Sequence, residues 1–168
     1  MFQDFNRYQF SVRENVGFGS VQHLHDDARI VRAIEAGGAT EVVNSLPQGM
    51  QAHLGKWFKD GQELSGGQWQ KIALARSFAR EEADVPILDE PTAALDAEAE
   101  HAVFERFRQM TKGRTAILIS HRFPTVRMAD RIIVLEGGGI VESGTHASLL
   151  SAQGRYAELF TLQAKGYL

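Results

Sequence analysis

The sequence predicts an α/β fold built on a parallel sheet, and three observations lead to that class. Two short, continuous apolar stretches, 85–88 and 115–119, are typical of strands buried on both faces of a parallel sheet. A helical pattern of apolar residues at 66–79 precedes the first strand, and a second one that begins at Asp96 lies between the strands. Strand–helix–strand order favours right-handed crossovers, so the 168 residues are expected to form one domain, or most of one.

The N-terminal part is predicted to be mainly helical. Residues 1–20 are expected to form a loop with short turns that leads into a helix. Asp27 can cap that helix, and the glycine pair at 37–38 ends it. A short helix is expected at 40–46 and a polar, glycine-containing loop at 53–63. The predicted apolar side of the helix after Asp27 consists of Ile30, Val31 and Ile34.

Single residues mark the limits of the elements around the two strands. Gly66 opens the helix before the first strand, and Pro86 must stand among that strand's first residues because proline cannot donate to a sheet. Asp96 caps the helix after the strand, and Gly113 lies just beyond its end. Its predicted inner face consists of Val103, Phe104, Phe107 and Met110.

The C-terminal part is predicted to contain a hairpin and two helices. Apolar stretches at 132–135 and 140–142 are joined through three glycines, which indicates a β-hairpin. Thr145 can cap a short helix that runs to Leu150. The final segment is expected to be an amphipathic helix that carries Tyr156, Leu159, Phe160 and Leu162.

Composition excludes several classes of protein. The formal net charge of −3 gives no basic field of the kind that nucleic-acid-binding proteins use. The chain contains no cysteine, which excludes disulfides and thiolate metal sites and fits a reducing cytoplasm. No apolar run approaches the roughly 18–20 residues that span a bilayer, and the first residues do not resemble a signal peptide. A membrane role would therefore need a partner chain or a segment outside this sequence.

The first candidate site is the acidic pair that ends the strand at 85–88. A carboxylate at the carboxyl end of a parallel strand lies where open α/β sheets bind ligands. Asp89 can hold a Mg²⁺ ion, usually through water, and Glu90 can orient or deprotonate an attacking water. The alternative is a loop with two solvated acids before a proline.

Ser65-Gly66-Gly67-Gln68 at a helix start is a second candidate. Glycines leave backbone N–H groups accessible, the serine hydroxyl can donate, and a helix N-terminus attracts anions. The alternative is an ordinary helix start capped by Ser65. His121 follows the second strand and could contact a terminal phosphate, although a histidine there is also a common polar turn residue.

Several motifs in one order resemble the ATP-binding cassette (ABC) family. The run 64–68 reads Leu-Ser-Gly-Gly-Gln, like the family's signature, and 88–96 reads Leu-Asp-Glu-Pro-Thr-Ala-Ala-Leu-Asp. Ser-His-Arg at 120–122 is similar to the family's switch-histidine region, and Gln3 stands where its glutamine loop is expected. The resemblance covers essentially the whole chain. It implies a P-loop NTPase-like parallel sheet with a helical signature subdomain.

The resemblance also implies a role for each matching residue. In this family two cassettes pair head to tail around two ATP molecules. Asp89 and Gln3 would serve the metal, Glu90 would be the general base and His121 would contact the terminal phosphate. Asp96 would link the two sites, with ATP and Mg²⁺ as cofactors. The four residues expected to serve the partner's nucleotide are Ser65, Gly66, Gly67 and Gln68.

Further stretches are similar to exporter-type cassettes. They include Ser-Val-Arg-Glu-Asn-Val at 11–16 and Gly-Thr-His at 144–146. This resemblance implies a transmembrane partner and a location at the cytoplasmic face of a membrane. It also divides the chain at about 83, with glutamine loop and signature before that point and metal-binding strand and switch histidine after it. The loop 55–61 departs from the acidic run that exporters often carry before the signature.

The family's phosphate-binding loop, Gly-x-x-x-x-Gly-Lys-Ser/Thr, does not occur in these 168 residues. At Gly55-Lys56 the residue five positions earlier is Met50, and Trp57 follows the lysine. The strands that accompany this loop at the N-terminal side of the family's domain have no candidate either. The chain is therefore expected to be part of a longer transporter subunit and not to turn over ATP by itself.

Two other interpretations remain open at this point. The chain could be a non-catalytic regulatory module that docks on a complete cassette and offers it the signature. It could also be a soluble cassette of DNA repair or chromosome maintenance. Against the latter, only about twenty residues separate the signature from Asp89, without the long insertion or zinc-binding cysteines of that class.

Overall fold

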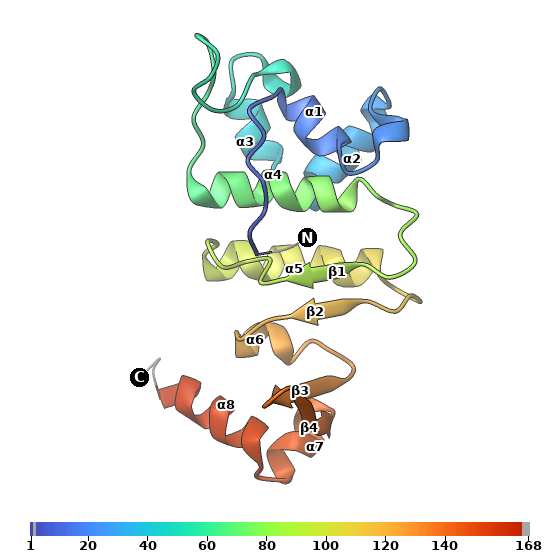
Figure 1. Ribbon diagram of the computed structural model, residues 1–168, viewed down its shortest axis with the longest axis vertical. Coiled ribbons are helices and arrows are strands. Elements are labelled where there is room, and N and C mark those ends of the chain that lie inside the picture. The colour runs from blue at the N-terminus through green and yellow to red at the C-terminus, as the bar shows by residue number, and fades with distance from the viewer. Residues whose placement is uncertain (2, 166–168) are drawn as a thin grey trace. The chain divides into compact units, whose positions relative to one another are not determined.

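The computed structural model describes residues 1 and 3–165, and the fold is α/β. The chain divides into two compact units, Met1–Ile117 and Leu118–Leu168, and each is described by itself. The elements of the first unit are α1 (Val12–Gly17), the 3-10 turn η1 (Val21–His23), α2 (Asp27–Ala36), α3 (Thr40–Ser45), the 3-10 turn η2 (Gly49–Gln51), α4 (Gly66–Phe78), β1 (Ile87–Asp89) and α5 (Ala97–Met110) (Figure 1).

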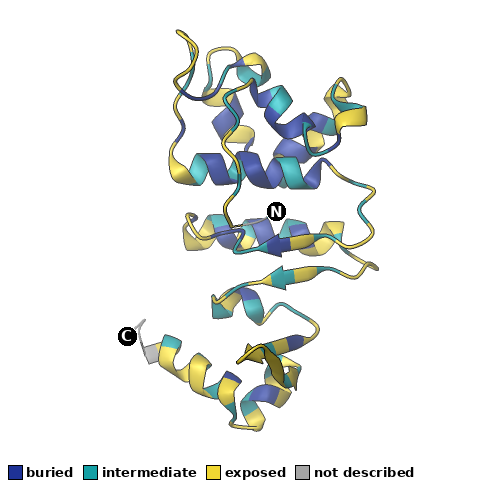
Figure 2. Cartoon of the chain, in the orientation of Figure 1, coloured by how far each residue is buried: buried dark blue, intermediate teal, exposed yellow. Residues whose placement is uncertain are grey.

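Helix α4 is the centre of the first unit's core, with α1 and α2 packed against it. Its buried side chains include Trp69, Ile72 and Ala75, which confirms the helical spacing expected at 66–79. Figure 2 shows α4 as largely buried beneath the three N-terminal helices. The helix begins at Gly66 as predicted, directly before the apolar residues that fix its place in the core.

Replacing Trp69 by alanine is expected to destabilise the first unit by about 3–5 kcal/mol, because the truncation opens a cavity in a packed core. Trp69 is 2% exposed, whereas Trp57 in the loop before α4 is 79% exposed. Trp57→Ala is therefore the matched control and should change stability by about 0.5 kcal/mol or less. Urea unfolding followed by circular dichroism measures both, and equal effects would contradict the position given to Trp69.

The first twenty residues were predicted to form only a loop and turns, and this is wrong. They contain α1, which a capping box begins: the Ser11 side chain accepts from the Glu14 N–H, and the Ser11 N–H donates to the Glu14 carboxylate at 2.8 Å. Ser-x-x-Glu is a known signal for the start of a helix, so residues 11–14 were sufficient to predict α1. Asp26, not Asp27, caps α2, since its carboxylate accepts from the Arg29 N–H at 3.0 Å.

Strand β1 was predicted to be buried on both faces, and this expectation is also wrong. Leu88 is 1% exposed but Ile87 beside it is 45% exposed, so the side chains alternate between a covered and an open face. The second strand, β2 (Ile117–Ile119), likewise leaves both isoleucines exposed. Pro86 precedes β1, and its carbonyl oxygen accepts from the Ile117 N–H at 2.9 Å. An apolar run therefore predicted the strands correctly but not how many faces are covered.

The helix ends in the first unit agree with the other expectations. Helix α3 covers 40–45, and the segment 53–63 is a loop with isolated bridges. Asp96 caps α5 by accepting from the Ala99 N–H at 2.9 Å. The buried apolar face of α5 consists of Val103, Phe104 and Phe107. The expectations for Met110 on this face and for Val31 on the apolar side of α2 are wrong, because these side chains are 37% and 41% exposed.

The second unit contains the predicted hairpin and helices. Strands β3 (Ile132–Glu136) and β4 (Gly139–Gly144) pair antiparallel, and Gly137 and Gly138 turn between them with positive φ. Thr145 caps α7 (His146–Ser151), as expected. The remaining helices are α6 (Phe123–Val126) and α8 (Arg155–Lys165), and the unit's small core consists of Ile132, Leu149 and Tyr156. Among the described residues, no helix is both long enough and apolar enough to cross a membrane.

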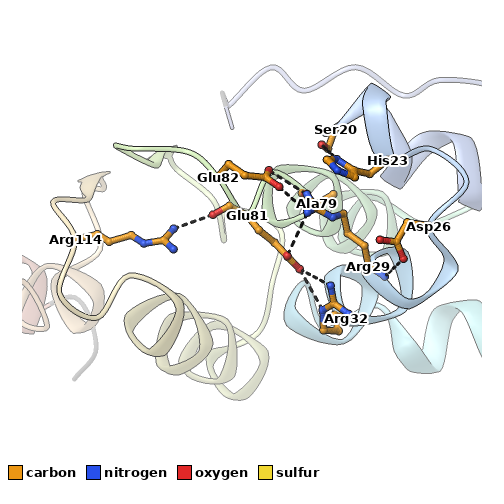
Figure 3. Close-up of polar contacts among 9 residues, drawn as sticks. All are labelled: Ser20, His23, Asp26, Arg29, Arg32, Ala79, Glu81, Glu82 and Arg114. Atoms are coloured by element: carbon orange, nitrogen blue, oxygen red, sulfur yellow. Dashed lines mark hydrogen bonds and ion pairs between the residues drawn. The ribbon is translucent and has the colours of Figure 1, made fainter.

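A group of ion pairs ties α2 to the segment that follows α4 (Figure 3). Arg29 donates to both carboxylate oxygens of Glu82, and Arg32 donates to the Glu81 carboxylate at 3.1 Å. Arg114 donates to the Glu81 backbone carbonyl at 2.9 Å. These contacts hold the start of the connection from α4 to β1 against α2 and against Arg114.

The Arg29–Glu82 pair predicts a specific dependence of stability on pH. The hydrogen bonds from Arg29 lower the pKa of Glu82 from 4.5 to about 2. Because Glu82 ionises more readily in the folded state, its carboxylate stabilises the fold above pH 4.5. This stabilisation is lost as the pH falls towards 2. Glu82→Gln should therefore lower the thermal midpoint slightly near neutral pH and leave it unchanged at the acidic end. The effect is small because Glu82 is exposed.

The control for this measurement is Glu35→Gln, which removes an exposed carboxylate from α2 itself. Thermal unfolding of the two variants and the wild type across this pH range separates a specific pair from a general loss of negative charge. The same pH dependence in both variants would contradict the role given to Glu82.

Candidate functional site

The turn at 65–68 presents backbone groups at the exposed start of α4. The Ser65 oxygen accepts from the Gln68 N–H at 3.3 Å, and the Gln68 side chain accepts from the Ser65 N–H at 2.8 Å. Ser65 and Gly66 are exposed, and a Cβ on Gly66 would meet no atom within 4 Å. The Ser65 oxygen acts as an acceptor, so its hydroxyl proton can be donated to a ligand. The turn is thus both a helix cap and an accessible set of anion-binding donors.

Asp89 ends β1 in the same unit, and Glu90 follows it directly. The Asp89 N–H donates to the Met1 carbonyl oxygen at 3.0 Å, and the Met1 amino group donates to the Ile87 carbonyl oxygen at 2.7 Å. The start of the chain therefore lies along β1, and Gln3 follows two residues after Met1 as an exposed side chain. Asp89 is half-buried at the carboxyl end of the strand, the position at which α/β sheets bind ligands.

Glu90 has an unusual backbone conformation. Its φ of 45° lies in the left-handed region, which costs a residue with a Cβ about 1–3 kcal/mol unless its surroundings hold it there. The side chain of Gln70 on α4 donates to the Glu90 carbonyl oxygen at 3.4 Å, and the Ala93 N–H donates to the same oxygen. A strained residue directly after a strand is typical of sites where a side chain must point at a ligand.

The segment 91–96 leads from Glu90 to the cap of α5. Thr92 and Leu95 are buried, and the Ala94 N–H donates to the Gln70 side-chain oxygen at 2.8 Å. Asp96 is exposed and caps α5. Through the Gln70 side chain, α4 thus connects the signature turn at its start to Glu90 and to the loop that leads to Asp96.

His121 belongs to the second unit, where it is exposed just after β2. Its carbonyl oxygen accepts from the Gln163 side chain of α8 at 2.8 Å, which ties the turn to that helix. The expected contact of His121 with a terminal phosphate stays a prediction.

Sequence reasoning missed Gln70. Its side chain is 2% exposed and bonds to the acidic loop at two points, although it lies only two residues after the signature. The signal was a glutamine directly after Trp69, in a helix whose residues at 72–75 are all apolar. A polar side chain in such a place must find partners when it is buried, so its bonding could have been expected, although the identity of the partners could not.

The residues at the end of β1 fit a magnesium ion that a nucleotide brings with it. In the part of the chain that the structure describes, no three His, Cys, Asp or Glu side chains form a metal-binding group. Mg²⁺ does not need such a group, because one or two carboxylates with waters and phosphate oxygens complete its octahedron. Asp89 supplies one carboxylate at a half-buried position, which suits that type of site.

Comparison with known proteins defines the class. The family described as ABC transporter matches residues 1–93 of this chain, which is more than half of it. The chain therefore belongs to the ABC transporter family. This confirms the resemblance seen in the signature and in the segment that follows β1.

Particular relatives are ATP-binding proteins of exporters. The chain is 42% identical over 159 residues to the subtilin transport ATP-binding protein SpaT of Bacillus subtilis, covering 95% of this chain and 26% of the relative. It is 43% identical over 162 residues to the ATP-dependent lipid A-core flippase of Ralstonia nicotianae, covering 96% and 27%. The chain thus spans about a quarter of the length of these relatives.

A solved structure gives the same result for the fold. The structure of a bacterial Atm1-family ABC exporter with ATP bound superimposes with a TM-score of 0.87 at 31% identity, over 97% of this chain and 27% of that one. The P-loop NTPase-like fold class expected from the motifs is confirmed, and so is the exporter type of the cassette.

Proposed function

We propose that this chain is the signature-bearing and base-bearing part of an exporter's ATPase, and that it couples ATP hydrolysis to transport across a membrane. The observation that carries the proposal is the first unit's arrangement, in which α4 joins the Ser65–Gln68 turn, whose first two residues are exposed, to the Asp89–Glu90 strand end. The substrates of the relatives, subtilin and lipid A-core, are named for those proteins. This chain carries no transmembrane segment among its described residues that would select a substrate.

In the proposed mechanism the acidic pair serves a nucleotide held on the same cassette. Asp89 would hold Mg²⁺, and Gln3 would supply a second oxygen ligand, as the family resemblance implies. Bound Mg²⁺ would neutralise charge on the phosphates during transfer to water. Glu90 would accept a proton from the attacking water while the water oxygen bonds to the terminal phosphorus and ADP leaves, and His121 would donate a hydrogen bond to the terminal phosphate. The left-handed backbone at Glu90 supports this assignment because strained conformations of this kind cluster at active sites.

The signature turn serves a nucleotide held on a second cassette. Two cassettes would pair head to tail, with Ser65, Gly66, Gly67 and Gln68 facing the partner's phosphates and Asp96 linking the two sites. The exposure of Ser65 and Gly66 at the start of α4 supports this arrangement, since a partner can reach them without any rearrangement of the helix. Transmembrane segments would hold the pair at the cytoplasmic face of the membrane.

ATP turnover by these 168 residues alone is not expected. The phosphate-binding loop that would hold the nucleotide against Asp89 and Glu90 is not in this sequence, so it would have to come from further polypeptide. The division of the chain at about residue 83 belongs to the same proposal, with glutamine loop and signature before it and metal-binding strand and switch histidine after it.

A regulatory module is the second candidate function. An exposed signature together with a sequence that lacks the phosphate-binding loop also fits a chain that docks on a complete cassette and completes only that cassette's site. In that case residues 65–68 would contact the nucleotide of the complete cassette, and Glu90 would take no part in hydrolysis.

One experiment separates the two functions. ATP binding and hydrolysis are measured for the purified chain, for the chain mixed with a complete exporter cassette, and for a subunit in which this sequence continues upstream into a phosphate-binding loop. The exporter-ATPase function predicts hydrolysis by the subunit that depends on Glu90. The regulatory function predicts stimulation of the complete cassette by the separate chain, insensitive to Glu90→Gln. Hydrolysis in none of these mixtures would contradict both.

A further inference from the structure

The side chain of Gln70 connects the two parts of the proposed site within the first unit. It projects from the first turns of α4 and is 2% exposed. Its oxygen accepts from the Ala94 N–H at 2.8 Å, and its nitrogen donates to the Glu90 carbonyl oxygen at 3.4 Å. One amide thereby bonds to both ends of the loop 90–94, and the buried side chain has both of its polar atoms paired.

A second contact brings the same loop against the signature itself. A Cβ on Gly67 would stand 3.0 Å from the Ala94 carbonyl oxygen, which is tighter than ordinary packing. The Ala94 carbonyl oxygen therefore lies against Gly67 of the signature turn, while the Ala94 N–H donates to the Gln70 side chain. Leu95, directly after it, is buried and would lie 3.8 Å from the same Cβ. The glycine at 67 is what allows this approach.

The loop needs such support because of its conformation. Glu90 has φ 45°, and a residue with a Cβ keeps this value only where neighbours over-determine it. The bond from Gln70 reaches the carbonyl of that residue, and the bond to Ala94 fixes the loop four residues later. The backbone of Glu90 is thus held from α4 as well as from β1.

We infer that Gln70 is a positioning residue that locks the loop 90–94 to the signature end of α4, so that Ser65–Gln68 and Glu90 move as one body. The functional consequence rests on the proposed function: contact of the signature turn with one nucleotide would be transmitted to the base of the other site. Gln70 itself is buried and is not assigned to either nucleotide. Its effect is to fix where Glu90 points.

The test is amide hydrogen exchange at Ala94 in the 168-residue chain, measured by NMR without nucleotide. Gln70→Met keeps the length and shape of the side chain but removes both hydrogen bonds, and it should speed exchange of the Ala94 N–H roughly fivefold to tenfold. Gln70→Glu keeps an oxygen that can accept from the Ala94 N–H but loses the donor to the Glu90 carbonyl oxygen, so its exchange at Ala94 should lie between those of the wild type and Gln70→Met. Partial rescue by glutamate is a result that loss of packing alone would not give.

Ser77→Ala is the matched control. Its hydroxyl bonds to the Leu74 carbonyl oxygen at 2.8 Å within the same helix, far along α4 from the loop. It should alter the overall stability of the helix without a selective change at Ala94. If Gln70→Met does not fold, Gln70→Asn gives the same comparison, because its amide is one methylene too short to reach both partners.

Unchanged Ala94 exchange in both Gln70→Met and Gln70→Asn would overturn the inference, and so would faster exchange in Gln70→Glu equal to that in Gln70→Met. A second readout uses the subunit that carries a phosphate-binding loop. There, Gln70→Met should lower kcat several-fold at unchanged KM for ATP, and a changed KM with unchanged kcat would contradict the coupling. If the wild-type subunit shows no hydrolysis at all, the proposed function fails, and the Ala94 exchange still decides the role of Gln70.

Discussion

Replacing Glu90 by glutamine is expected to leave ATP binding intact and to reduce turnover by at least about a hundredfold. The assay uses a subunit in which this chain stands with a phosphate-binding loop. Glutamine has the size and hydrogen-bonding geometry of glutamate but cannot accept a proton from water. It also tolerates the backbone at φ 45° about as well as glutamate does, so the strained turn after β1 should persist. Binding depends on groups that this change leaves in place.

The control is Glu41→Gln, which removes an exposed carboxylate on α3 in the same unit. It should change neither binding nor turnover. Equilibrium binding of a fluorescent ATP analogue and steady-state phosphate release measure the two quantities. Near-normal turnover in Glu90→Gln would remove Glu90 from the role of base, and a loss of binding equal to the loss of turnover would indicate a structural effect instead.

Replacing Ser65 by arginine is expected to abolish the catalytic contribution of the signature, with a loss of turnover of tenfold or more. The long side chain would occupy the space before the first turn of α4, where Gly66 now leaves the backbone open. The Ser65 oxygen that accepts from the Gln68 N–H would also be lost. Loss of an N-cap alone costs about 0.5–2 kcal/mol of stability, so the catalytic effect must be separated from this one.

Thr145→Arg provides the separation. Thr145 caps α7 in the second unit with the same capping-box pattern, and its oxygen accepts from the Ser148 N–H at 3.2 Å. Both arginine variants lose a cap, but only Ser65→Arg changes a residue assigned to the nucleotide. Similar losses of turnover in the two variants would show that capping, and not recognition of a nucleotide, explains the effect of Ser65.

The sequence predicted best those features of the fold that depend on contacts between residues a few positions apart. Asp96 and Thr145 cap helices through bonds within one turn, and both were predicted correctly. The capping box of Ser11 and Glu14 is equally local, so the sequence contained a signal for α1 although the prediction for residues 1–20 is wrong. At the start of α2, Asp26 and Asp27 are both suitable caps, and residue type alone does not determine which of them adopts the extended backbone of a cap.

The errors in the sheet and in the site have a non-local origin. Ile87 and Ile117 were expected to be buried because they stand in apolar runs, but the burial of a strand depends on what packs against each face. The motifs predicted Ser65, Asp89 and Glu90 as site residues. They did not predict Gln70, because its importance lies in bonds to residues 20 and 24 positions away.

The central claim is that the signature turn acts on the partner's nucleotide while Glu90 acts on its own, and mixing two inactive variants tests it most directly. Each of Ser65→Arg and Glu90→Gln alone disables both sites of a symmetric pair. In a mixed pair, the site that combines an intact Glu90 with an intact Ser65 from the other subunit is restored.

Subunits of the two variants are combined in equal amounts before assembly, and phosphate release is measured. Turnover should return to about a quarter of the wild-type rate, since about half of the pairs are mixed and each contains one intact site of two. If the mixture is as inactive as either variant alone, Ser65 and Glu90 act on the same nucleotide, and the head-to-tail arrangement proposed for this chain is wrong.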